Sequence, residues 1–207
     1  MPKQSHRTVV IVLTDPNYLV PSSPDAPAGV AWLRASVARF SNGATHQRRR
    51  ALAVSELAAI DPNALRALAI RRSTGPVEVL AEALGLPATV AEDIVVIAKS
   101  YHPHTTITPA ADQAVEHLVQ ILGAHDETTA NRIALLIQAC DATTALVKNI
   151  LAGRTDPPVP KTRRVAPNGE TVEIDLTETP FGAGPHACPA RLHALALADG
   201  LTTGKCE

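Results

Sequence analysis

The chain has 207 residues, a formal net charge of −1 at pH 7 and 45% hydrophobic residues, whereas aromatic residues amount to only 2%. The near-neutral charge excludes a nucleic-acid binder of the usual basic kind. A core built from Ala, Leu, Val and Ile favours closely packed helices and predicts a mainly α fold. The length is enough for one sizeable core, so we expect a single domain over residues 1–207.

Three cysteines, Cys140, Cys188 and Cys206, stand at irregular spacings. They imply no disulfide framework and favour a reducing compartment. The apolar run near the N-terminus is too short for a signal peptide or for a membrane span. We therefore expect a cytoplasmic protein without a membrane segment.

The first predicted element is an apolar, β-branched run over residues 8–20, whose period does not separate a short strand from a buried helix. A Pro/Ser-rich loop follows. Residues 29–40 have apolar side chains at helical spacing and predict one helix, which the sequence Ser-Asn-Gly ends. Another helix is expected from about residue 45 to residue 60, before an Asp-Pro pair.

Five further helices are predicted in the middle of the chain. The helix over 61–72 has an Asp N-cap and Pro at its first position. Glycine and proline separate the helices over 74–85 and 87–100, and a Thr-Pro start and a final Gly bound the helix over 108–123. The longest helix is expected over 126–153.

The last part of the chain changes character. Residues 154–164 are rich in proline and must be extended, and Asn168-Gly169 within residues 164–176 is a strong hairpin signal. A loop with glycines, histidine and cysteine follows, and residues 190–201 predict a short helix. The fold class is therefore mainly α, with a small β element before the cysteine loop.

The cysteine loop is suited to hold a soft metal. Gly182 and Gly184 allow tight turns at positive φ, and Phe181 offers a flat apolar face. Cys188 stands just ahead of a helix, where backbone N–H groups and the helix dipole are expected to lower the pKa of a thiol. A thiolate there suits iron, zinc or copper(I).

The motif F-G-x-G-x-H-x-C, formed by Phe181, Gly182, Gly184, His186 and Cys188, resembles the haem-binding loop of the cytochrome P-450 superfamily. The resemblance implies a shortened cytochrome P-450-like helical fold that binds haem b. It implies that Cys188 is the thiolate ligand of the haem iron, and that His186 holds a propionate.

Other segments resemble the same family in the same order. His46 and Arg50, in an H-x-x-x-R motif, resemble the C-helix pair and share a helix face, from which both can donate to propionates. Thr143 occupies the position of the oxygen-activating threonine of the I helix. After the predicted longest helix, Arg164 fits best as a further propionate ligand, and Arg163 next.

The sequence departs from the family pattern in several places. Only 45 positions separate Thr143 from Cys188, fewer than the family has, and no Glu is followed three residues later by Arg, so the K-helix Glu-x-x-Arg pair is absent. Ala190 replaces the usual glycine. Where the family has an acidic residue directly before the threonine, this sequence has Ala142, and Asp141 lies one place earlier. We expect Asp141 and Thr143 on the oxygen side of the haem.

These observations lead to an expected function and its alternatives. The resemblance implies a monooxygenase that oxidises a small apolar substrate with O₂ and electrons from a ferredoxin-type partner. One alternative is a catalytically degenerate binding or partner protein, with or without haem, and another is a haem enzyme that uses peroxide. Individual residues also have alternative interpretations. The basic run around His46 can be a solvated helix face or can meet an acidic redox partner, and Thr143 can donate a hydrogen bond to a carbonyl of its own helix. His186, Cys188, His193 and Cys206 can together hold zinc.

Overall fold

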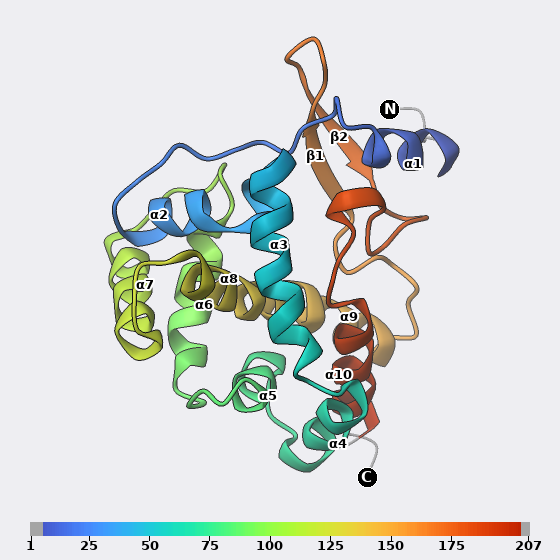
Figure 1. Cartoon of the computed structure of the whole chain (residues 1–207). Helices are drawn as coiled ribbons and strands as arrows, with labels where there is room; N and C mark the ends of the chain where they lie inside the picture. The colour runs from blue at the N-terminus through green and yellow to red at the C-terminus, as the bar shows by residue number, and fades with distance from the viewer. Residues whose placement is uncertain (1–5, 204–207) are drawn as a thin grey trace.

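The computed structural model describes residues 6–203. Helices pack into a bundle, and a β-hairpin extends from one end of it beside α1 (Figure 1). The segment Glu127–Leu151, which we call the central helix, runs through the bundle between α5, α6 and α10. In chain order the helices are α1 (His6–Thr14), α2 (Gly29–Ser36), α3 (Gly43–Ala58), α4 (Pro62–Arg72), α5 (Pro76–Ala83), α6 (Val90–Tyr101), α7 (Pro109–Leu122), α8 (Glu127–Gln138), α9 (Thr144–Leu151) and α10 (Arg191–Thr203).

Side-chain caps start several helices where the sequence predicts them. Asp61, Thr108 and Asp126 each accept a hydrogen bond from a backbone N–H in the first turn of α4, α7 and α8. Each cap satisfies one of the N–H groups that a helix start leaves without a partner. These boundaries follow from local chemistry, so the sequence was sufficient to place them.

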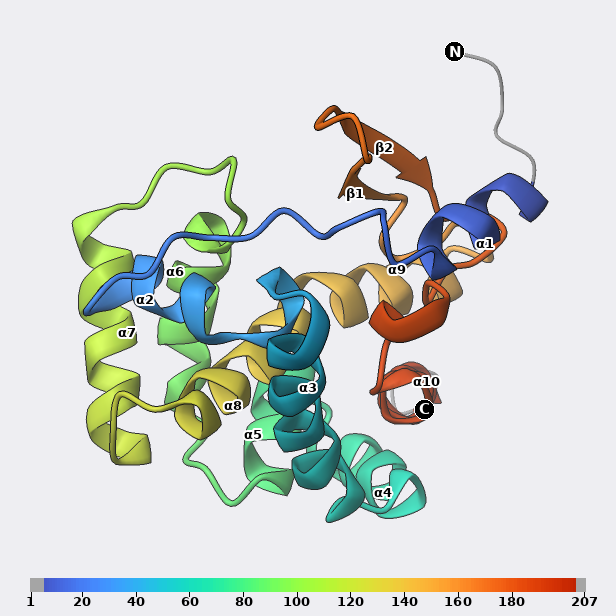
Figure 2. The ribbon, with the colours of Figure 1, turned by 45° about the horizontal axis from the view of Figure 1, so that its top comes forward.

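The N-terminal apolar run forms helix α1, which settles the choice between strand and helix. Val9 and Leu13 pack against Ile174 and Leu176 of the hairpin segment and make a small core of their own. Figure 2 shows α1 alongside β2 and next to the loop that precedes α10. The apolar side of a short helix is thus covered by the hairpin.

The helix predicted over residues 29–40 is interrupted, and the expectation of one helix is wrong. α2 ends at Ser36, Val37 is extended, and a 3₁₀ turn, η1 (Ala38–Phe40), follows. The N–H of Ala38 donates to the side-chain oxygen of Asn131 on α8 at 3.2 Å. A tertiary contact therefore takes over a backbone donor that the helix would have used.

The predicted longest helix consists of α8, a π turn, η2 (Ala139–Thr143), and α9. The segment Glu127–Leu151 is long and apolar enough to cross a membrane by length and composition. Half of its most apolar window is buried inside the fold, as in the core helix of a globular protein. Its place in the bundle accounts for its composition.

The hairpin consists of β1 (Lys161–Val165) and β2 (Thr171–Asp175), paired antiparallel with Val165 opposite Thr171. Gly169 has a φ of 86°, and its N–H donates to the carbonyl of Ala166 at 2.8 Å. The predicted hairpin is confirmed. Within residues 6–203, no helix lies between α9 and β1, in keeping with the short sequence interval there.

Candidate functional site

Backbone hydrogen bonds fold the cysteine loop back on itself. The N–H of Cys188 donates to the carbonyl of Phe181 at 2.8 Å, and the N–H of Ala187 donates to that of Gly184 at 3.1 Å. Gly182 and Gly184 have φ values of 71° and 67°, in the left-handed region that favours glycine. The loop therefore contains the tight turns that its glycines predict.

Gly184 also lets α1 approach the loop. A Cβ at this position would lie 2.7 Å from the carbonyl oxygen of Leu13 and 3.0 Å from the Cα of Thr14. Backbone atoms cannot move aside as a flexible side chain can. A larger residue would therefore separate α1 from the cysteine loop, which lie together in Figure 2.

The thiol of Cys188 lies in a mixed environment. The residue is exposed, but protein atoms crowd the sulfur, and this desolvation raises the pKa of Cys188 above its usual value. The N–H of Ala190 and the charges of Arg50 and Arg39 act in the opposite direction without outweighing it. The expected lowering of the pKa is therefore wrong for the free thiol. α10 begins only at Arg191, beyond the range over which a helix dipole acts strongly.

His46 and His186 pack ring against ring. Their centroids are 3.8 Å apart, and the ring planes are inclined by 34°. Burial, and to a lesser extent the charges of Arg50 and Arg164, lower the pKa of both rings, and the pKa of His186 falls to about 3. The structure thus brings two predicted propionate ligands, one from α3 and one from the cysteine loop, into direct contact.

Arg164 on β1 is a buried cation without a counter-ion. It is 5% exposed, and its guanidinium donates only to Thr162 Oγ1 (3.1 Å) and to the carbonyl of Arg163 (2.9 Å) among residues 6–203. Burial lowers the pKa of Arg164, and the charge of Arg39 adds to this. Arg163, by contrast, is exposed and faces Glu173 at 3.5 Å. Of the two candidate arginines, only Arg164 lies beside the histidines.

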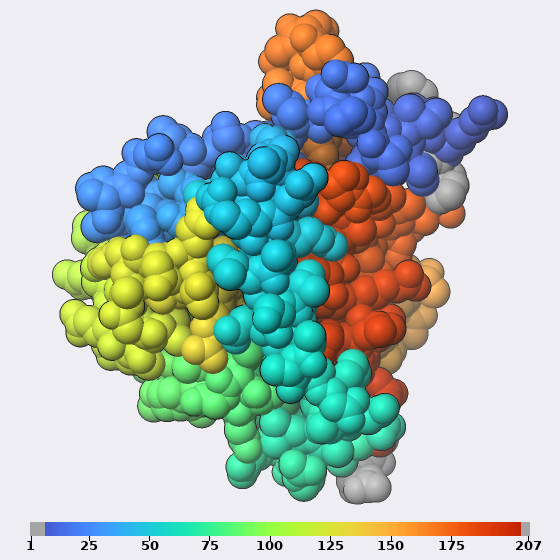
Figure 3. All heavy atoms as spheres, viewed as in Figure 1, coloured from blue at the N-terminus to red at the C-terminus, as the bar shows by residue number. Residues whose placement is uncertain are grey.

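Three arginines and two histidines from four segments form what we call the basic cluster. The charges of these arginines act to lower the pKa values of His46, His186 and Cys188, and Arg39 acts in the same way on Arg164. No acidic side chain within residues 6–203 acts on these four pKa values. In the space-filling view, α3 and the segment that leads into α10 lie against each other (Figure 3). The members of the basic cluster are Arg39, His46, Arg50, Arg164 and His186.

Arg39 is the member that sequence reasoning missed. It lies in η1, directly after the break in the predicted helix. The break is accompanied by the hydrogen bond from Ala38 to Asn131, a contact between distant parts of the chain. The spacing of residues in the sequence therefore does not predict that Arg39 lies near the candidate site. Only the folded chain brings it close to Arg164 and Cys188.

The two residues predicted on the oxygen side lie at the π turn of the central helix. Thr143 is buried, whereas Asp141 is exposed. Among the described residues, no hydrogen bond or ion pair joins either side chain to the basic cluster. Widened turns of this kind are frequent at functional sites. The back-bonding alternative for Thr143 finds no support, since its hydroxyl makes no hydrogen bond to its own helix in this part of the chain.

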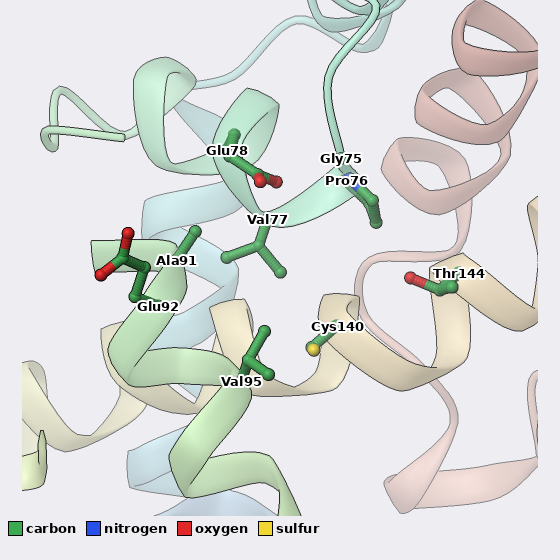
Figure 4. A pocket seen from close by; sticks show the side chains of 9 residues that line it. All are labelled: Gly75, Pro76, Val77, Glu78, Ala91, Glu92, Val95, Cys140 and Thr144. Atoms are coloured by element: carbon green, nitrogen blue, oxygen red, sulfur yellow. The ribbon is translucent and has the colours of Figure 1, made fainter. Parts of the chain in front are cut away.

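An open cleft of about 490 Å³ lies on another side of the same turn (Figure 4). Cys140 points into it between α5 and α6, and Thr144 lines it, whereas Asp141 and Thr143 do not. Burial raises the pKa of Cys140. Cys140 and Cys188 therefore belong to different surroundings.

The zinc alternative receives no support from the described residues. The Nε2 of His193 lies 3.0 Å from the carbonyl of Leu57 and 2.9 Å from that of Ile60, so this ring is engaged at the end of α3. No group of three metal-ligating side chains is found within residues 6–203, and Cys206 lies outside that range.

No protein-family model and no curated protein matches the chain. A solved structure, the crystal structure of P450BioI in complex with an acyl carrier protein ligated to hexadec-9Z-enoic acid, matches with a TM-score of 0.66. The sequence identity is 14%, and the match covers 97% of this chain and 83% of that chain. The chain has a cytochrome P450-like fold. The predicted fold class is thus confirmed, and at this identity the likeness concerns the fold alone.

The residues of the site fit the haem group that this fold accommodates. Haem carries two carboxylates, and the basic cluster offers several donors around a buried guanidinium that has no counter-ion in the described part of the chain. A buried cation without an anion is costly, so an anionic partner would stabilise this arrangement. The iron of haem accepts a thiolate, and Cys188 is an exposed residue whose sulfur lies within electrostatic reach of Arg39 and Arg50 of the basic cluster.

Proposed function

We propose that the chain binds haem b through Cys188 and acts as a monooxygenase-type oxidoreductase on a small apolar substrate. The observation that carries the proposal is the buried charge of Arg164 beside His46 and His186, which no carboxylate within residues 6–203 compensates. Arg39 and Arg50 of the same cluster lie within electrostatic reach of the Cys188 thiol. A cluster of cationic side chains next to a soft ligand is complementary to a group that is anionic at its edge and contains iron at its centre.

Each residue of the site has a separate role in this proposal. Arg50 and Arg164 bind the propionates by charge-assisted hydrogen bonds, and His46 and His186 donate through their ring N–H groups. Cys188 supplies the thiolate, and a hydrogen bond from the backbone N–H of Ala190 stabilises its negative charge. When bound, haem supplies oxygen activation.

Phe181, Gly182 and Gly184 give the loop its shape. The guanidinium of Arg191 lies 5.5 Å from the Phe181 ring centroid, a cation–π contact that ties the loop to the first turn of α10. On the opposite side, the Thr143 hydroxyl is proposed to hold a proton next to the reacting oxygen. Asp141 is exposed to solvent at the same turn.

A monooxygenase of this type needs electrons from a partner, and we propose a ferredoxin-type protein. The similar solved structure is a complex with an acyl carrier protein, which is a property of that protein. We place the chain in the cytoplasm, because the two described cysteines are free thiols, as expected in a reducing compartment.

The first prediction tests haem ligation. The chain, expressed with a haem supply, is reduced and exposed to CO, and its absorption spectrum is recorded. We expect the strongly red-shifted Soret band of a thiolate-ligated haem, and we expect Cys188→Ala to abolish it because the ligand is removed. Cys140→Ala, in separate surroundings, should leave the band unchanged. Retention of the band by Cys188→Ala, with helical circular dichroism intact, would identify another ligand.

A catalytically degenerate binding protein is the second candidate, and specific observations favour it. Asp141 makes no hydrogen bond or ion pair with Thr143 within residues 6–203, and the sequence contains no Glu-x-x-Arg pair. The two candidates differ in the haem-loaded protein. Substrate-dependent consumption of a chemical reductant and O₂ supports the oxidoreductase, whereas normal haem uptake without such consumption supports the binding protein.

A further inference from the structure

Arg39 extends the basic cluster toward a part of the fold that the proposed function does not use. Its guanidinium has no carboxylate partner among residues 6–203, and its only hydrogen bond there is a long one, 3.4 Å, to the Gln138 side chain of α8. Gln138 is the last residue of α8, directly before the π turn. Arg39 therefore reaches from η1 to the central helix next to the turn that carries Thr143.

The C-terminal end of α6 lies against η1 and adds donors to the same region. The Phe40 and Tyr101 rings are 5.2 Å apart, and the His102 ring lies 6.0 Å from that of Tyr101. Arg34 fixes this segment, since its Nη2 donates to the carbonyls of Ser100 and His102, both at 2.6 Å. The placement of His102 next to η1 is therefore built into the fold.

Tyr101 provides a second, independent sign of a missing partner. The residue is 2% exposed, and its hydroxyl has no hydrogen-bond partner among residues 6–203. A buried hydroxyl without a partner is costly and uncommon. The hydroxyl lies within the electrostatic reach of Arg39 and Arg34, and burial raises the pKa of Tyr101, so it remains a neutral donor.

His102 lies in equally cationic surroundings. Burial, and to a lesser extent the charges of Arg39, His104, Arg34 and Arg163, together lower the pKa of His102 to about 4. The His102 and His104 rings stack at 5.4 Å. Of these charged neighbours, Arg163 is the one that faces a carboxylate, that of Glu173.

We propose that Arg39, His102 and the Tyr101 hydroxyl form a subsite for the carboxylate of an otherwise apolar substrate. The proposal rests on the function proposed above and narrows its substrate class to amphipathic carboxylic acids. A guanidinium fork, a ring N–H and a hydroxyl are the donors that a carboxylate needs. The contact of Arg39 with Gln138 places the bound carboxylate beside the central helix, so the apolar part of the substrate can extend along the π turn.

The test compares decanoate with 1-decanol, which share a chain and differ in charge. Isothermal titration calorimetry on the haem-loaded protein should give at least about tenfold tighter binding of decanoate. Arg39→Gln should weaken decanoate about tenfold, the loss expected for one charge-assisted hydrogen bond. It should leave decanol binding unchanged. Tyr101→Phe should weaken decanoate about threefold without affecting decanol.

Arg72→Gln is the matched control, because it removes the same charge from an exposed position on α4 that already faces Glu82. It should leave decanoate binding unchanged. Absence of decanoate binding, equal affinities for decanoate and decanol, or equal effects of Arg39→Gln and Arg72→Gln would overturn the subsite. Loss of haem from Arg39→Gln would also overturn it and would make Arg39 a propionate ligand.

Failure of the proposed function gives a different result. If the wild-type chain takes up no haem, the haem-binding proposal fails, and the same titrations are made on the haem-free chain. Preference for decanoate that depends on Arg39 then still supports the carboxylate subsite. No such preference rejects the subsite as well.

Discussion

Glu127, in the first turn of α8, joins α3 to the central helix through two arginines. Its Oε1 accepts from the Nε of Arg49 at 2.8 Å, and both of its oxygens accept from the guanidinium of Arg48, at 2.8 and 2.9 Å. The hydrogen bonds from Arg48 lower the pKa of Glu127 most, burial opposes them, and Arg49 adds to the lowering, which brings the pKa to about 2. Ionised Glu127 is therefore favoured in the folded state.

The second prediction concerns the pH dependence of this contact. A carboxyl whose pKa is lower in the folded than in the unfolded chain stabilises the fold above the unfolded value of about 4.5, and the contribution disappears as the pH falls toward about 2. We expect Glu127→Gln to lower the free energy of unfolding by about 1 kcal/mol at pH 7. The difference should shrink steadily below pH 4.5 in urea titrations.

Glu82→Gln is the control for this measurement. Glu82 also accepts two hydrogen bonds from one arginine, Arg72, but the pair is largely exposed and lies outside the contact between α3 and α8. We expect a smaller effect at pH 7. An effect of Glu127→Gln that is constant from pH 7 to pH 3 would show that the ion pair does not cause it.

At the scale of elements, α4 and α10 pack closely against each other at Gly200. A Cβ on Gly200 would lie 2.5 Å from the carbonyl oxygen of Arg66 and 2.7 Å from the Cβ of Ala69. The glycine thus lets the backbones of the two helices approach. The gain of about 1 kcal/mol that alanine offers inside a helix cannot be realised without separating them.

The third prediction is that Gly200→Ala lowers the free energy of unfolding by about 1–3 kcal/mol, measured by urea denaturation. Gly75→Ala serves as the comparison, because a Cβ there meets only the flexible carboxylate end of Glu78. That variant should change the stability by less than about 1 kcal/mol. Equal or greater stability of Gly200→Ala would mean that α10 moves away from α4 at little cost.

The elements that the sequence predicts well are those with local causes. The caps at Asp61, Thr108 and Asp126 and the hairpin around Gly169 depend on residues within a few positions. The break after α2 depends on Asn131, which is 93 positions from Ala38, so periodicity could not reveal it.

The same distinction applies to the candidate site. The cysteine loop and the H-x-x-x-R helix could be located because their residues are close in sequence. The stacking of His46 on His186, the burial of Arg164 and the approach of Arg39 depend on how four segments meet. The raised pKa of Cys188 likewise reflects crowding by the folded chain, which the motif alone does not describe.

At the scale of the whole molecule, the fold brings Arg39, Arg50 and Arg164 near one another, and within residues 6–203 no ion pair joins any of the three to a carboxylate. The basic cluster draws on η1, α3, β1 and the cysteine loop, whose positions are set by apolar packing elsewhere, such as that of α1 on the hairpin. Assembling this cluster costs free energy, which the rest of the fold must offset. The basic cluster lowers the stability of the fold, and it favours the binding of an anionic group.

The last prediction follows from this opposition and concerns Arg164→Met. Methionine fills a similar volume without a charge, so the haem-free variant should be more stable than wild type by about 1–3 kcal/mol in urea denaturation. The haem-loaded variant should instead lose haem faster to excess apomyoglobin, because one propionate partner is missing. Arg163→Met, exposed and facing Glu173, should change neither quantity. Destabilisation of the haem-free variant would show that Arg164 stabilises the fold itself, and the buried charge would then no longer indicate an anionic ligand.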